Sequence, residues 1–246
     1  MRKVVKNVIL VLLILTFLTL SFSTVLLSYL YFFASDDESL SGEWMTELDM
    51  TEHAVFTALG WLQEIEAVSI SREEMETYMQ NLTIQINLTL EQTAQAGGTF
   101  QCSVVPESYD SCSQAAYEAF ARAFQELLAR RLQMAGYLGS TDEDAIEALV
   151  TETFGMSTVT YLMSCAPALL PSLEELQAQY EGNGTYETAE NILTWQFGND
   201  GDGMTRAEYY IKNDIHLILT EEVSPGGDDP QDEYYPVIYT LKNAQD

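Results

Sequence analysis

Histidine and cysteine, the side chains most often used for nucleophilic catalysis or transition-metal binding, are rare in this chain. There are two histidines, His53 and His216, and three cysteines, Cys102, Cys112 and Cys165. His53 falls in the first turn of a predicted helix, and His216 alternates with apolar residues in a predicted strand. Their spacing supports no Ser/His/Asp or Cys/His arrangement and no zinc-type cluster. We therefore predict a protein that is not an enzyme, with no catalytic residue, metal or cofactor.

Carboxylates are abundant, with 38 Asp and Glu against 10 Lys and Arg and a net charge of −28 at pH 7. Because any two carboxylates could form an acid/base pair, their number identifies no active site. The segment 199–203 is similar to the start of a calcium loop but lacks its later ligands and glycine, so we interpret it as a hairpin turn, with calcium binding as the alternative. The acidic field repels phosphates, which argues against nucleic acid as a partner. Two interpretations of this acidic surface remain. It keeps the protein soluble, or it binds cations or a basic partner.

An uncharged stretch from Val8 to Phe33 predicts where the protein is located. At about 1.5 Å per residue, it is somewhat longer than the roughly 30 Å hydrocarbon core of a bilayer. Basic residues precede it and acidic residues follow it, so we expect a cytoplasmic tail over 1–7, a transmembrane signal-anchor over 8–33 and a tether over 34–41. The rest, 42–246, would be an extracytoplasmic domain on the cell membrane. A cleaved signal peptide is the alternative, and a Cys102–Cys112 disulfide stays open.

Two kinds of periodicity divide the remaining chain. Alternating apolar residues predict three strands at about 42–49, 82–90 and 99–105, and five more at about 184–188, 191–197, 206–212, 214–220 and 235–242. A helix is predicted over 52–67 with Thr51 as its N-cap, and a helical turn after Ser71. The segment 106–181 is expected to be helical, with helices starting at Ser140, Ser157 and Ser172.

Three predicted strands share the same start, a glycine two residues before an aromatic residue. The pairs are Gly42 and Trp44, Gly98 and Phe100, and Gly184 and Tyr186. We interpret these glycines as turn residues, with a Gly-Gly turn at 97–98. Such strand starts are typical of meanders and closed barrels, and eight antiparallel strands can close a small barrel. The expected fold class is α+β, an antiparallel eight-stranded barrel interrupted by a helical insertion at about 106–181, plus one N-terminal transmembrane helix.

The Gly42-Glu43-Trp44 opening and the strand count together resemble the lipocalin or calycin barrel. More closely, Ser41-Gly-Glu-Trp, Gly-Gly-Thr-Phe, Gly-Thr-Tyr-Glu-Thr and Leu-Thr-Trp are similar to uncharacterised lipocalin-like, membrane-anchored extracytoplasmic domains of Gram-positive bacteria. The resemblance covers the strands and leaves out the helical insertion.

This resemblance implies non-catalytic binding of a small apolar ligand in the barrel or at its junction with the helices. We expect four aromatic residues to contact that ligand, Phe120, Phe124, Tyr186 and Trp195, and four residues to be structural, Gly42, Trp44, Gly98 and Gly184. The alternative is a protein-interaction or regulatory module that docks through the helical insertion.

Overall fold

The computed structural model describes residues 39–64, 70–198, 204–222 and 235–242. The chain divides into two compact units, residues 1–39 and Leu40–Asp246, and almost all described residues belong to the second. The predicted anchor over 8–33 lies outside the described residues. Among those that are described, no helix has the length and apolar character needed to cross a bilayer.

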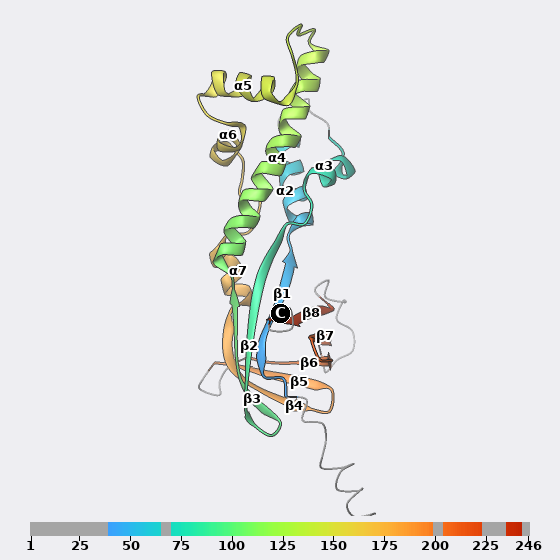
Figure 1. Cartoon of the computed structure of the whole chain (residues 1–246), viewed down its shortest axis with the longest axis vertical. Helices are drawn as coiled ribbons and strands as arrows, with labels where there is room; N and C mark the ends of the chain where they lie inside the picture. The colour runs from blue at the N-terminus through green and yellow to red at the C-terminus, as the bar shows by residue number, and fades with distance from the viewer. Residues whose placement is uncertain (1–38, 65–69, 199–203, 223–234, 243–246) are drawn as a thin grey trace, which may run out of the picture. The chain divides into compact units, whose positions relative to one another are not determined.

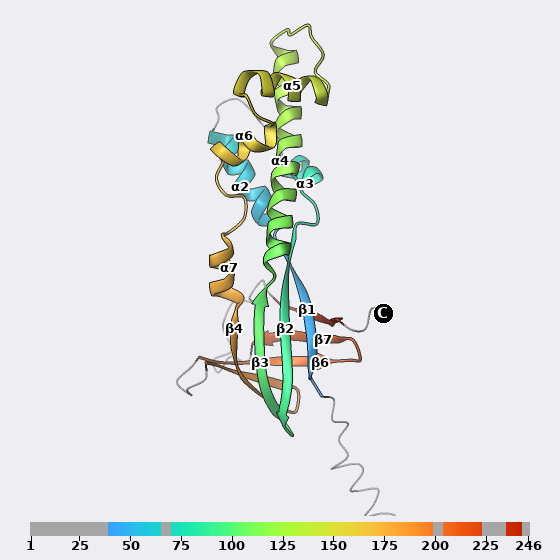
Figure 2. The same ribbon diagram turned by 60° about the vertical axis from the view of Figure 1, so that its left-hand side comes forward.

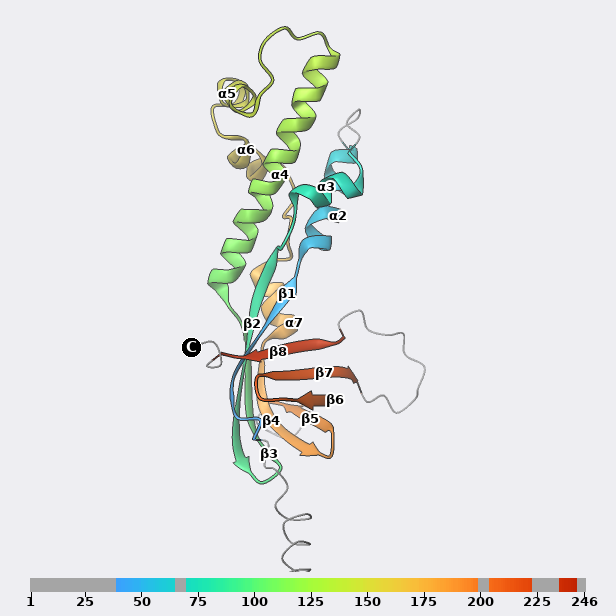
Figure 3. The same cartoon turned by 45° about the vertical axis from the view of Figure 1, so that its right-hand side comes forward.

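Eight antiparallel strands form a closed barrel in which each strand pairs with its neighbour in the sequence, as expected (Figures 1 and 3). The last strand closes the barrel on the first, where Trp44 pairs with Leu241 and Met45 with Thr240. Closure leaves no free sheet edge in this ring. The strands are β1 (Gly42–Asp49), β2 (Thr83–Ala94), β3 (Gly97–Val104), β4 (Gly182–Ala189), β5 (Ile192–Phe197), β6 (Thr205–Lys212), β7 (His216–Glu222) and β8 (Val237–Leu241).

All the described helices connect strands at the same end of the barrel. The helices are α2 (Thr51–Glu64), α3 (Arg72–Tyr78), α4 (Pro106–Met134), α5 (Glu143–Phe154), α6 (Thr158–Cys165) and α7 (Leu173–Tyr180). Because α2 and α3 join β1 to β2, and α4 to α7 join β3 to β4, both connections leave from what we call the helical end (Figure 2). The opposite, turn end carries short turns at 95–96, 190–191 and 213–215.

The six described helices α2 to α7, which together we call the helical layer, come from two separate insertions in the barrel, whereas the sequence indicated a single insertion at 106–181. Residues of α2, α3, α4, α6 and α7 share one hydrophobic cluster, which we call the helical core. A second cluster, the barrel core, lies inside the ring of strands. Strand β2 contributes to both, since Leu82, just before it, and Ile84 belong to the helical core, and Leu88 and Leu90 to the barrel core.

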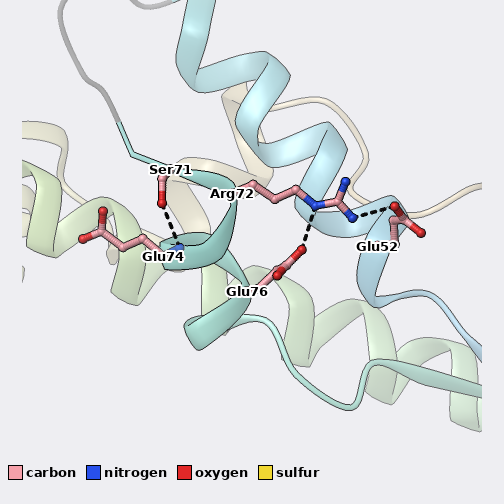
Figure 4. Close-up of polar contacts among 5 residues, drawn as sticks. All are labelled: Glu52, Ser71, Arg72, Glu74 and Glu76. Atoms are coloured by element: carbon pink, nitrogen blue, oxygen red, sulfur yellow. Dashed lines mark hydrogen bonds and ion pairs between the residues drawn. The ribbon is translucent and has the colours of Figure 1, made fainter.

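Polar contacts join the helices to one another at their exposed surfaces. The Arg72 guanidinium contacts the Glu52 carboxylate of α2 at 2.6 Å and Glu76 of its own helix at 2.7 Å (Figure 4). Arg130 of α4 contacts both Glu74 of α3 and Glu126. Exposed ion pairs contribute little stability individually, so the packing of the helical core stabilises the contact between the helices more than these pairs do.

Serine caps begin three of the helices at the predicted positions. Ser71 and Ser157 accept hydrogen bonds from backbone N–H groups three residues later, and Ser172 forms a full capping box with Glu175 (Figure 4 shows the first). At α5 the prediction was wrong by two residues. Asp142 is the N-cap, and the Ser140 hydroxyl donates a hydrogen bond to the Asp142 carboxylate at 2.6 Å.

The predicted N-cap of α2 is also wrong. Thr51 is the first residue of the helix, and its N–H donates to the Asp49 carboxylate at 2.8 Å. The Thr51 hydroxyl oxygen instead accepts the N–H of Leu82 at 3.2 Å, which connects the start of α2 to the start of β2.

Two of the repeated glycines are needed for close packing between strands, and not for turns as we predicted. The β2–β3 turn lies at 95–96, and Gly98 lies within β3. A Cβ atom at Gly98 or Gly184 would overlap a backbone carbonyl oxygen of the neighbouring strand. Each faces an aromatic partner, since Gly98 pairs with Tyr186 and Gly184 with Phe100. The glycines therefore let aromatic rings lie against the backbone inside the barrel.

Candidate functional site

The four aromatic residues expected at a ligand site fall into two different cores. Phe120 and Phe124 lie on α4 within the helical core, where Phe120 is fully buried. The Phe120 ring packs edge-on against Trp61 at a centroid distance of 5.7 Å. Tyr186 and Trp195 belong to the barrel core. The structure thus brings together two of the four, and Phe120 and Phe124 hold helices together.

Tyr186 and Trp195 form part of an aromatic wall inside the barrel. They pair across β4 and β5, with ring centroids 6.3 Å apart. Phe100 packs edge-on against Trp195 at 4.9 Å and against Phe197 at 5.2 Å. The apolar side chains of Leu193, Leu217 and Leu219 are buried in the same core.

A polar cluster lies beside this wall, and we call Trp195, Arg206, Glu208 and Tyr235 the inner polar cluster. Glu208 is only 4% exposed, and its carboxylate accepts a hydrogen bond from Trp195 Nε1 at 2.5 Å. The Tyr235 hydroxyl donates to the other carboxylate oxygen, which also contacts Arg206 Nη2 at 2.9 Å. Because β6 and β8 start at the helical end, Arg206 and Tyr235 lie toward that end of the barrel. A buried carboxylate is thus paired and hydrogen-bonded on both oxygens.

Sequence reasoning missed Arg206, Glu208 and Tyr235. The available signal was the spacing of Arg206 and Glu208, which are two residues apart in a strand and so point to one face. In an open sheet such a pair would indicate a solvent face. In the closed barrel, this face of β6 is the inner face, so both side chains lie among the aromatic residues.

Burial keeps the inner phenols protonated. The pKa of Tyr235 is raised by burial and then by its hydrogen bond to Glu208. The pKa of Tyr239, on β8, is raised by burial and then by the nearby Cys102 and Glu208. The pKa of Tyr186 is raised by burial and then by Tyr210. At neutral pH these side chains act as hydrogen-bond donors and not as bases.

The three cysteines are free thiols in different surroundings. Cys102 lies beside the barrel core, Cys112 is buried in α4 within the helical core, and Cys165 is exposed at the end of α6. Burial raises the pKa of the Cys102 thiol to about 12 and that of Cys112 to about 11.

We therefore expect iodoacetamide at pH 8 to modify Cys165 at least tenfold faster than the other two thiols, because the thiolate is the reactive form. Mass spectrometry of the alkylated peptides from the native chain measures this. The same reagent in urea should modify all three cysteines, as a control. Rapid native labelling of Cys102 would contradict its burial.

Trp44 closes the turn end of the barrel core. Its side chain is 1% exposed, and its Nε1 donates a hydrogen bond to the Leu40 carbonyl oxygen at 2.8 Å. Gly42 lies close to Leu241, where β8 meets β1. Leu40 is also buried in the barrel core, so the segment before β1 covers this end.

The remaining chemistry-bearing residues do not converge on the barrel core. His53 is exposed on α2, and His216 lies on β7 with its neighbour Leu217 facing inward. Among the described residues, no three His, Cys, Asp or Glu side chains could together hold a metal ion. The predicted turn at 199–203 lies outside the described residues.

Comparison of the chain with protein-family models, with curated proteins and with solved structures gives no match.

Proposed function

We propose that this chain is a membrane-anchored, extracytoplasmic, lipocalin-like binding protein that holds a small apolar ligand in its barrel and catalyses no reaction. The observation that carries this proposal is the lining of the closed barrel. One side is aromatic and aliphatic, and the inner polar cluster adds a few fixed polar groups. Ligand sites typically combine apolar walls with a few placed polar groups, and eight strands are the number at which a barrel holds one small ligand or is filled by side chains.

The membrane location in this proposal rests on the sequence. The uncharged segment from Val8 to Phe33 has the length of a membrane-spanning helix and is preceded by Arg2, Lys3 and Lys6. An anchor of this kind would hold the barrel beside a bilayer, which is a source of apolar molecules. The resemblance to lipocalin-like domains of Gram-positive bacteria agrees with that location.

Native mass spectrometry of the full chain, purified in lipid nanodiscs, tests the proposal. We expect the native protein to carry extra mass that leaves on denaturation. Leu193→Trp, which places a larger side chain at a fully buried barrel position, should reduce the occupied fraction at least fivefold. Phe56→Ala, at a side chain that is 78% exposed on α2, is the control and should keep the extra mass. A bare native mass, also after incubation with a lipid extract, would contradict ligand binding.

A second candidate function is docking of a protein partner on the helical layer. It is favoured by exposed apolar residues where α4 ends, since Met134 is 80% exposed, Tyr137 46% and Leu138 99%. Leu138→Asp should then weaken capture of the partner by the full chain at least tenfold, whereas Met204→Asp, at an exposed residue just before β6, should not. Equal capture by both variants would exclude this surface as the docking site.

A further inference from the structure

The hydroxyl group of Tyr186 is buried and has no hydrogen-bond partner among the described residues. The residue is 3% exposed and lies in β4, on the aromatic wall of the barrel. A buried polar group without a partner is rare in folded proteins and costs free energy. Among the described residues, this hydroxyl therefore remains available to donate a hydrogen bond to another molecule.

The neighbouring polar groups of the barrel already have partners. Trp195 Nε1 and the Tyr235 hydroxyl both donate to Glu208. Arg206 pairs with the same carboxylate, so the charges of the inner polar cluster cancel. A ligand therefore meets no uncompensated positive charge at this cluster, and the net charge of −28 on the chain disfavours an anion further.

The Tyr186 phenol offers a proton. Its pKa is raised by burial and then by Tyr210, so the hydroxyl stays protonated through neutral and mildly basic pH. The walls around it are apolar, with Phe100 and Leu193 in the same core. A group that accepts one hydrogen bond without bringing a charge fits these surroundings best.

We propose that the Tyr186 hydroxyl donates a hydrogen bond to an uncharged acceptor oxygen of the bound molecule, so that the barrel takes a neutral amphiphile, such as an ester or a ketone with a hydrocarbon chain, in preference to a fatty-acid anion. This inference rests on the proposed function and names its ligand class. It also assigns Tyr186 as the residue that distinguishes such a ligand from a plain hydrocarbon.

Three probes of similar length test the proposal: methyl decanoate, tridecane and decanoate. They are measured as radiolabelled compounds by equilibrium binding to the full chain in lipid nanodiscs, with empty nanodiscs giving the share that the lipid takes up. The two uncharged probes differ in hydrophobicity as well as in hydrogen bonding, so the contribution of the hydrogen bond is read from the change in each affinity when the Tyr186 hydroxyl is removed. Decanoate should bind more weakly than the ester.

Tyr186→Phe should weaken the binding of methyl decanoate about tenfold, as the loss of one buried hydrogen bond would give, and leave the affinity for tridecane unchanged. Tyr137→Phe, at an exposed position on the helical layer, is the matched control and should leave both affinities unchanged. If Tyr186→Phe binds methyl decanoate as tightly as the unaltered chain does, if it weakens tridecane equally, or if decanoate binds most tightly, the inference is wrong while ligand binding stands. If none of the three probes binds, the proposed function fails together with it.

Discussion

Replacing Trp44 by alanine is expected to lower the free energy of unfolding by about 4 kcal/mol, because deletion of a fully buried aromatic side chain loses transfer energy and leaves a cavity. Trp44 is 1% exposed in the barrel core, and its Nε1 donates to the Leu40 carbonyl oxygen. Loss of that hydrogen bond accounts for about 1 kcal/mol of this total. Urea denaturation of the full chain, followed by circular dichroism, measures the change.

One further variant separates packing from hydrogen bonding at Trp44, and another, at an exposed position, is the control. Trp44→Phe keeps an aromatic ring but removes the donor, so its loss should lie well below that of the alanine variant. Phe56→Ala removes an aromatic side chain that is 78% exposed and should change stability by less than about 0.5 kcal/mol. A loss at Trp44→Ala no larger than that of Phe56→Ala would show that the segment before β1 does not close the turn end.

Replacing Glu208 by leucine should lower the free energy of unfolding by about 3 kcal/mol. Removal of one member of a buried ion pair leaves its partners without compensation. Trp195 Nε1, Arg206 and Tyr235 all contact this carboxylate, and each would lose it. The figure is at the lower end of the usual range, because the Arg206 side chain is 38% exposed and can remain partly hydrated.

The double variant Glu208→Leu with Arg206→Met provides the critical comparison. Since an apolar pair can replace a buried ion pair with little loss, the double variant should recover at least half of the stability lost by Glu208→Leu alone. Glu187→Leu, at an exposed position on β4, is the matched control and should have almost no effect. Additive losses in the double variant would mean that Arg206 and Glu208 do not act as a pair.

The strands were predictable from the sequence because alternation has one physical cause, a buried face opposite a face turned outward. All eight strands lie close to their predicted places, and closure of the barrel follows from their number. The caps at Ser71, Ser157 and Ser172 were predictable for a similarly local reason. Asp142 was missed because Ser140 offered the same cap signal two residues earlier.

Features that depend on contacts between distant segments were not predictable. The role of Gly98 requires knowing that Tyr186 lies opposite it, 88 residues later in the chain. Phe120 and Phe124 have the spacing of a helix face, which does not say whether that face meets a ligand or another helix. The inner polar cluster joins β5, β6 and the residues just before β8, and only closure of the barrel turns Arg206 and Glu208 inward.

The continuity of β2 has a consequence for how the chain can be divided. Apolar residues on one face of this strand contribute to both hydrophobic cores. Leu82 and Ile84 pack in the helical core, and Leu88 and Leu90 pack in the barrel core. Removing the helices would expose the first half of that face to water. The same strand, β2, pairs with both β1 and β3 in the barrel. We therefore expect the helices and the barrel to unfold together as one cooperative unit, and we expect neither to remain folded when the other is removed.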